Sequence, residues 1–170
     1  MIYEFCAENV TLLEKAMQAG ARRIELCDNL AVGGTTPSYG VTKAAVELAT
    51  NYDTTIMTMI RPRGGDFVYN DLEIAIMLED IRLTAQAGSQ GVVFGALTAD
   101  KKLDKSNLEK LIAASKGMEI VFHMAFDELS DDDQLEAIDW LSQAGVIRIL
   151  TRAGVSGDSL EKRFAHYHRI

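Results

Sequence analysis

The chain of 170 residues has few cysteines, few prolines and a deficit of positive charge. Its two cysteines, Cys6 and Cys27, cannot build the disulfide framework of a small secreted protein, so we expect a reducing, cytoplasmic location. Basic residues number 17 against 25 acidic residues, for a net charge of −8. This balance argues against nucleic acid as a partner, because that binding requires Lys and Arg to neutralise phosphates.

Long apolar runs are also absent. No stretch approaches the roughly 20 residues that span a bilayer, and the N-terminus lacks the pattern of a signal peptide, so we expect no membrane partner. The composition, 48% hydrophobic and 25% charged, is that of a globular protein. No low-complexity segment or linker divides the chain, and we expect a single domain over residues 1–170.

The tripeptide Gln-Ala-Gly occurs three times, at residues 18–20, 86–88 and 143–145. Each copy closes an amphipathic segment and precedes a short apolar or β-branched run. A glycine just beyond a helix adopts a positive φ at little cost, so the pattern is typical of a helix end. The repeat therefore predicts three joints at which a helix is followed by a strand.

Extending this pattern predicts six strands that alternate with helices. The strands are expected at residues 2–7, 23–27, 55–61, 91–97, 119–125 and 146–151, and the helices at 10–19, 41–51, 71–87, 105–115, 131–144 and from Ser159 onward. Strict alternation predicts an α/β protein with a parallel sheet covered by helices. The longest loops, residues 28–40 and 62–70, follow strands, which favours a TIM (β/α)8-type barrel over an open doubly wound sheet.

The length of the chain predicts that this barrel is incomplete. A TIM barrel has eight β/α units, and the spacing of the predicted strands leaves room for about six. We therefore expect a C-terminally truncated barrel domain. Strands without a neighbour expose their backbone groups, which favours association between copies of the chain into a homo-oligomer.

The first two predicted strands share one pattern, Glu4-Phe5-Cys6 and Glu25-Leu26-Cys27. Side chains alternate faces along a strand, so Glu and Cys share the face that we expect to point into the barrel. Adjacent parallel strands lie about 4.8 Å apart, which would bring the two thiols together. Two thiols suit Cu(I), with zinc as a competitor that normally takes four ligands. The alternative is that both cysteines are small apolar residues of the core.

The most distinctive loop reads Arg61-Pro62-Arg63-Gly64-Gly65-Asp66. The guanidinium groups of Arg61 and Arg63, beside the backbone N–H groups of Gly64 and Gly65, suit a carboxylate or phosphate. The alternative is a structural turn in which Arg61 pairs with an inward carboxylate such as Glu25.

A histidine lies on the fifth predicted strand, and an aspartate follows that strand. His123 is a candidate acid, base or metal ligand near neutral pH, and Asp127 follows beyond the strand end. A lone inward histidine is also a common structural residue. His166 and His168 are two residues apart and would not share a helix face, so we do not interpret them as a metal pair.

Taken together, residues 25–27, 33–38, 61–69 and 122–127 resemble the CutC family of copper homeostasis proteins, in the order of that family across residues 2 to about 154. The resemblance implies a (β/α)8 barrel and a cytoplasmic protein that handles copper. It places Cu(I) on two cysteines, whose positions match Cys6 and Cys27.

The chain departs from the family pattern in two places. Members of the family often carry arginine where this sequence has Met124, which weakens an anion-binding role in that stretch. From the family pattern we also expect that the last barrel units, with a glycine-rich strand end after the sixth strand, are missing from this sequence.

The sequence thus predicts a cytoplasmic copper homeostasis protein that binds Cu(I) through Cys6 and Cys27, and leaves one alternative open. The alternative is a TIM-barrel enzyme for a small anionic substrate, a carboxylate or a phosphate. Its clamp would be Arg61 and Arg63, and its acid–base and orienting residues would be Glu25, Asp66, His123 and Asp127. The sequence does not identify a reaction.

Overall fold

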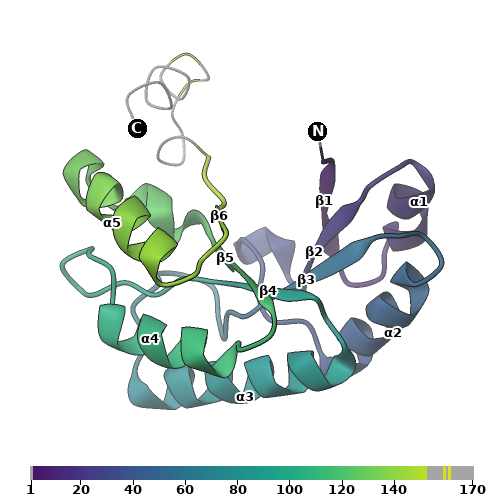
Figure 1. Ribbon diagram of the computed structural model, residues 1–170, viewed down its shortest axis with the longest axis horizontal. Helices are drawn as coiled ribbons and strands as arrows, with labels where there is room; N and C mark the ends of the chain where they lie inside the picture. Colours follow the sequence, from purple (N-terminus) through teal and green to yellow (C-terminus); the bar gives the residue numbers. More distant parts are fainter. Residues whose placement is uncertain (1, 153–158, 160, 162–170) are drawn as a thin grey trace.

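The computed structural model describes residues 2–152, 159 and 161. In these residues strands and helices alternate as the sequence predicts (Figure 1). The strands are β1 (Glu4–Glu8), β2 (Arg23–Cys27), β3 (Thr55–Met59), β4 (Gly91–Phe94), β5 (Glu119–Phe122) and β6 (Arg148–Ile149). The α-helices are α1 (Leu13–Gln18), α2 (Tyr39–Ala49), α3 (Asp71–Ala87), α4 (Lys105–Ala114) and α5 (Asp131–Gln143), and two 3-10 helices are η1 (Leu30–Val32) and η2 (Met124–Glu128).

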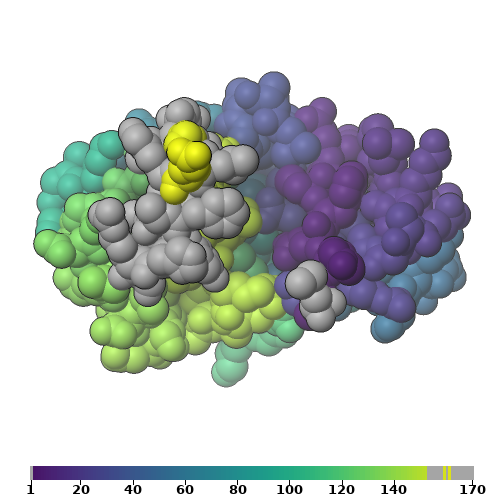
Figure 2. Space-filling view, turned by 90° about the horizontal axis from the view of Figure 1, so that it is seen from above, coloured from purple at the N-terminus to yellow at the C-terminus, as the bar shows by residue number. Residues whose placement is uncertain are grey.

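The strands form one parallel sheet in which β1 to β6 pair in chain order. Figure 1 shows α2, α3 and α4 along the outer side of the curled sheet, with α1 and α5 toward its two ends. This arrangement is a TIM-type barrel in which the described residues supply six of the eight strands, which confirms the predicted fold class. Within the described residues β1 and β6 are the two edges, and Figure 2 shows α5 (green) and the N-terminal residues (purple) on opposite sides.

The two faces of the sheet carry different side chains. The outer face packs against the helices in two clusters, one around Ile24, Leu26 and Ile56 and the other around Val92 and Phe94. The inner face carries a smaller cluster of buried side chains, made of Cys27, Met57, Met59, Val93 and Val121. The alternation along each strand therefore separates a helix-packed core from a barrel interior that contains sulfur.

The three Gln-Ala-Gly copies end helices as predicted. Gly20, Gly88 and Gly145 follow α1, α3 and α5 with φ of +99°, +89° and +87°. These are left-handed conformations, which glycine adopts without the steric cost of a side chain. The strands β2, β4 and β6 begin within a few residues of each copy, so the three predicted joints are confirmed.

Several boundaries differ from the prediction. The first helix begins at Leu13 rather than at residue 10, because Asn9 and Leu12 adopt positive φ of 57° and 59° that interrupt a helix. The strand β5 ends at Phe122, so His123 lies just beyond it as the N-cap of η2. Most of the helix predicted from Ser159, with His166 and His168, lies outside the described residues.

None of the helices in the described part of the chain has the length and apolar character needed to cross a bilayer.

Candidate functional site

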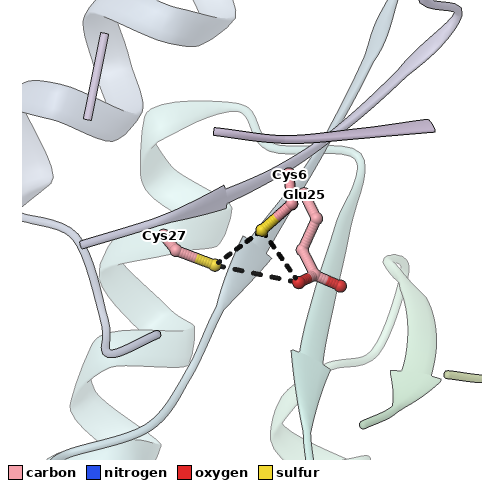
Figure 3. A group of neighbouring side chains, drawn as sticks. All are labelled: Cys6, Glu25 and Cys27. Carbon is pink, nitrogen blue, oxygen red and sulfur yellow. Dashed lines mark hydrogen bonds between the residues drawn. The ribbon is translucent and has the colours of Figure 1, made fainter. Parts of the chain in front are cut away.

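Two thiols and one carboxyl group meet on the inner face of β1 and β2. The Sγ atoms of Cys6 and Cys27 are 3.9 Å apart. Both thiols contact Oε1 of Glu25, at 3.6 Å from Cys6 and 3.8 Å from Cys27. Figure 3 shows the three side chains pointing toward one another. Among the described residues they form the one group of three Cys, His, Asp or Glu side chains close enough to hold a metal ion.

The register between the two strands places this cluster. Cys6 on β1 lies opposite Glu25 on β2. Cys27 lies two residues farther along β2, opposite Glu8. The two cysteines are therefore diagonal neighbours, staggered by two residues, rather than a directly opposed pair. This offset of two residues places Glu25 beside both sulfur atoms.

The cluster lies half in solvent and half in the protein interior. Cys27 is fully buried, Glu25 is 7% exposed and Cys6 is exposed. Both cysteines are free thiols. An ion can therefore reach the cluster from the side of Cys6, while Cys27 and Glu25 supply a shielded inner wall.

Two groups of the cluster, Glu25 and Cys27, have raised pKa values. Burial raises the pKa of Glu25, and the nearby carboxylate of Glu4 raises it further. The pKa of Cys27 is also raised, first by its contact with Cys6 and then by burial. No lysine or arginine among the described residues forms an ion pair with Glu25, whereas Glu4 pairs with Arg23 at 3.2 Å. Among the described residues the cluster therefore has no cationic side chain of its own.

Arg61 occupies a separate part of the barrel mouth. Its side chain donates hydrogen bonds to three backbone carbonyls, those of Val32 at 2.9 Å, Gly34 at 3.0 Å and Gly65 at 2.7 Å. The structural alternative that paired Arg61 with Glu25 is wrong, because these carbonyls are its partners. Arg61 holds the loops after β2 and β3 together.

The rest of the arginine–glycine loop is engaged in its own contacts. Arg63 forms ion pairs with Asp66, at 3.0 Å, and with Glu73. Glu73 is also the third residue of a capping box with Asn70 at the start of α3, so the same carboxylate fixes the loop and the helix. The Arg63 charge is thus satisfied within its own segment. Asn70 and Glu73 in the sequence are the signal by which this capping role could have been found.

His123 and Asp127 follow β5 at the same end of the barrel. His123 is 1% exposed, and its Nδ1 accepts a hydrogen bond from the N–H of Ala125 at 3.2 Å. Burial, followed by the charge of Arg61, lowers the pKa of His123 to about 3. Asp127 accepts hydrogen bonds from the hydroxyl of Thr151 and from the N–H of Arg152, the latter at 2.9 Å.

A cavity of about 190 Å³ opens between the loops that follow β2, β3 and β5. Its lining includes Gly33, Arg61, Phe67, Met124, Asp127 and Arg152. Arg61 and Asp127 were expected from the sequence, whereas Phe67 was not. The centre of the Phe67 ring lies 4.8 Å from the Arg61 guanidinium carbon and 4.8 Å from the centre of the His123 ring.

The contacts do not favour the enzyme alternative. The proposed acid–base residue, His123, is held neutral at physiological pH and does not contact Glu25 or Asp127 in any hydrogen bond of the described residues. Glu25 belongs to the thiol cluster, and Asp66 belongs to the Arg63 turn. The residues assigned to one catalytic machinery therefore lie in three separate groups.

The fold and this cluster define a TIM-type barrel with a Cys2Glu group that could hold a metal ion. Comparison with known proteins gives the family. The model of the CutC family matches residues 1–164, and the chain belongs to that family.

Relatives with this fold and high identity are known from several bacteria. A CutC family protein of Enterococcus faecalis is 52% identical over 170 residues, which is 100% of this chain and 81% of that protein. One of Streptococcus pyogenes is 54% identical over 151 residues, covering 89% of this chain and 72% of the other. The crystal structure of a CutC protein from Streptococcus agalactiae superposes with a TM-score of 0.93 at 46% identity, covering 98% of this chain and 79% of that one.

Proposed function

We propose that this CutC family protein binds copper as Cu(I) through the thiolates of Cys6 and Cys27 and serves copper homeostasis in the cytoplasm. The observation that supports the proposal most is the approach of the two Sγ atoms to 3.9 Å, beside one carboxyl oxygen. Membership of the family, and the naming of the Streptococcus agalactiae protein for copper homeostasis, point the same way. Copper is here the cargo of the protein.

The spacing of the sulfur atoms suits a bent, three-coordinate ion better than a linear one. With metal–sulfur bonds of about 2.3 Å, sulfur atoms 3.9 Å apart subtend roughly 115° at the ion. That angle leaves one side of the ion open to a third ligand. Oε1 of Glu25 is close enough to be that ligand, since it lies 3.6 Å from the Cys6 sulfur and 3.8 Å from the Cys27 sulfur. Glu25 therefore contributes either a weak third bond or a hydrogen-bonding neighbour to the thiolates.

Zinc is the metal that most needs to be distinguished from copper. Zinc would accept the same two thiolates and the carboxylate and take a fourth ligand from water. Soft thiolates on an ion of low coordination number favour Cu(I). In a competition between the two ions, the proposal predicts that Cu(I) displaces zinc stoichiometrically, and retention of zinc would overturn the choice of metal.

The direct test is a titration of the reduced protein with Cu(I) against a competing chelator. We expect about one equivalent to bind, and the double variant Cys6→Ser/Cys27→Ser to lose more than about 100-fold in affinity, beyond what loss of a supporting group costs. Binding that is unchanged in the double variant would overturn the proposal.

A matched pair of carboxylate variants separates the role of Glu25 from general charge. Glu25→Gln should weaken Cu(I) binding by about 10-fold, as expected for a group that contacts the ligands. Glu4→Gln removes a carboxylate from the same face of β1, yet Glu4 pairs with Arg23 and lies outside the cluster. We expect Glu4→Gln to bind Cu(I) like the parent protein, and equal losses in both variants would contradict a specific role for Glu25.

A further inference from the structure

The charge of Arg61 has no acidic partner among the described residues. Its side chain is 3% exposed and bonds only to backbone carbonyls. Carbonyls satisfy the N–H groups but leave the net positive charge unbalanced, and a buried charge is normally paired. The other arginine of the same loop, Arg63, has two carboxylates, so the difference is specific to Arg61.

Hydrogen-bond donors around Arg61 also lack partners. Five buried side-chain polar atoms have none within the described part of the chain, and two of these, Nε of Arg61 and Nε2 of His123, belong to neighbouring side chains. Since Nδ1 of the neutral His123 accepts a hydrogen bond, its proton is on Nε2, which is therefore a donor. The ring of Phe67 lies against both Arg61 and His123. Buried polar groups are rarely left unpaired, and of these side chains Arg61 lines a cavity, so its Nε–H is suited to an acceptor from outside the chain.

The cavity beside Arg61 limits the size of such an acceptor. Its volume of about 190 Å³ is a little larger than the roughly 150 Å³ that holds benzene, so it admits about six to eight non-hydrogen atoms. A drug-sized molecule or a nucleotide would not fit. The cavity therefore selects a small ligand.

The acidic residues of the cavity do not neutralise Arg61. Both carboxylate oxygens of Asp127 accept hydrogen bonds, from Thr151 and from the backbone of Arg152. Glu128 pairs with Lys101 at 3.1 Å. The partners of Asp127 are neutral and do not balance a carboxylate charge, so an anion would meet Asp127 as well as the two arginines of the lining, Arg61 within and Arg152 at the exposed rim.

We propose that this cavity binds a small oxyanion, either a carboxylate or a phosphate, on the buried charge of Arg61 with Arg152 at its rim. The site does not rest on the copper proposal, because it shares no side chain with the Cys6, Glu25 and Cys27 cluster. It also differs from the clamp expected from the sequence, since Arg152 takes the place of Arg63. No reaction is attached to this site.

The test is a charge series at Met124, whose half-buried side chain lines the cavity. Substitution of Arg61 itself would also release three carbonyls and disturb folding. Met124→Glu places a carboxylate in the cavity and should weaken anion binding at least about 10-fold by like-charge repulsion. Met124→Arg should strengthen binding by a similar factor, and the matched control Met124→Leu should leave it unchanged.

Binding is measured by isothermal titration calorimetry with inorganic phosphate and, separately, with acetate. Sodium chloride holds the ionic strength constant. The site is supported if either probe binds saturably and its affinity decreases in the order Met124→Arg, Met124→Leu, Met124→Glu. The probe that binds more tightly identifies the class of oxyanion. The Cys6→Ser/Cys27→Ser variant should bind the anion normally. The proposal is overturned if neither probe binds, or if the three Met124 variants bind equally, which would indicate an adventitious ion only.

Discussion

Two regions at the barrel interior have opposite chemical character. The cluster on β1 and β2 offers two thiols and a carboxyl group and has no cation. The region after β3 and β5 has a buried guanidinium and unpartnered donors and no anion on Arg61. The two regions are joined by Gly34, whose carbonyl binds Arg61 and whose α-carbon lies against Cys27, so that an added Cβ would come within 3.1 Å of Sγ. Under the two proposals, one end of the barrel presents a site for a cation and a site for an anion, one loop apart.

The pH dependence of copper binding should show the largest effect. Both thiols must lose a proton to become thiolates, and the pKa of Cys27 is raised above its usual value. Below the thiol pKa values, metal binding therefore releases up to two protons, and affinity should rise by up to about 100-fold per pH unit. A chelator competition at several pH values between 6 and 8 checks this, and a flat profile would contradict thiolate ligation. Anion binding at the Arg61 cavity should not share this slope.

Removal of the Arg61 side chain should reduce stability more than any other single change in the arginine–glycine loop. Arg61→Ala deletes three charge-assisted hydrogen bonds and leaves carbonyls unpaired, so the free energy of unfolding should fall by about 3–5 kcal/mol. Arg63→Ala is the matched control, and because its side chain is 38% exposed we expect a loss of about 1 kcal/mol or less. Urea denaturation of both variants measures the difference, and equal losses would show that Arg61 does not hold the loops.

His123 should make stability depend on acid. Its pKa is about 3 in the folded protein, against an ordinary value of 6.5, so between these values the unfolded chain binds a proton that the folded chain does not. The stability that depends on neutral His123 is fully present above pH 6.5 and is lost as the pH falls toward 3, by up to about 1.4 kcal/mol per unit. The variant His123→Gln should have a flatter profile below pH 6. Parallel profiles for the two proteins would remove His123 as the cause.

The smallest expected effect concerns the loop that joins the two regions. Gly34→Ala and Gly20→Ala both place alanine at a positive φ, +90° and +99°, and each should cost about 1 kcal/mol in stability. At Gly34 the added Cβ also presses on Cys27, whereas at Gly20 nothing lies within 4 Å. Copper affinity should therefore fall a few-fold, roughly 2- to 5-fold, in Gly34→Ala alone. A drop of the same size in Gly20→Ala would mean that the effect is global.

Patterns within single elements were readable from the sequence. The Gln-Ala-Gly copies end helices because a glycine with positive φ is a local property, and the strands follow at the predicted places. The approach of Cys6 and Cys27 was also predictable, because side-chain alternation puts them on one face of neighbouring strands. Their stagger by two residues was not, because register depends on how the whole sheet closes rather than on either strand.

The partners of the arginines were harder to anticipate. Arg61 and Arg63 are two residues apart in one loop, yet Arg61 binds carbonyls of another loop and Arg63 binds a carboxylate of α3. Only the packing of loops from β2 and β3 decides which guanidinium is buried. The pairing of Asp127 with Thr151 and Arg152 similarly joins segments more than 20 residues apart, and the local sequence contains no signal for it.

The ligands of copper can be observed directly by X-ray absorption at the copper K edge, on the reduced protein loaded with one equivalent of Cu(I). We expect an edge typical of Cu(I) and a first coordination shell dominated by two sulfur atoms, both lost in the Cys6→Ser/Cys27→Ser variant. A first shell of nitrogen or oxygen alone, or the same sulfur signal in the double variant, would contradict the assignment of the cation site to Cys6 and Cys27.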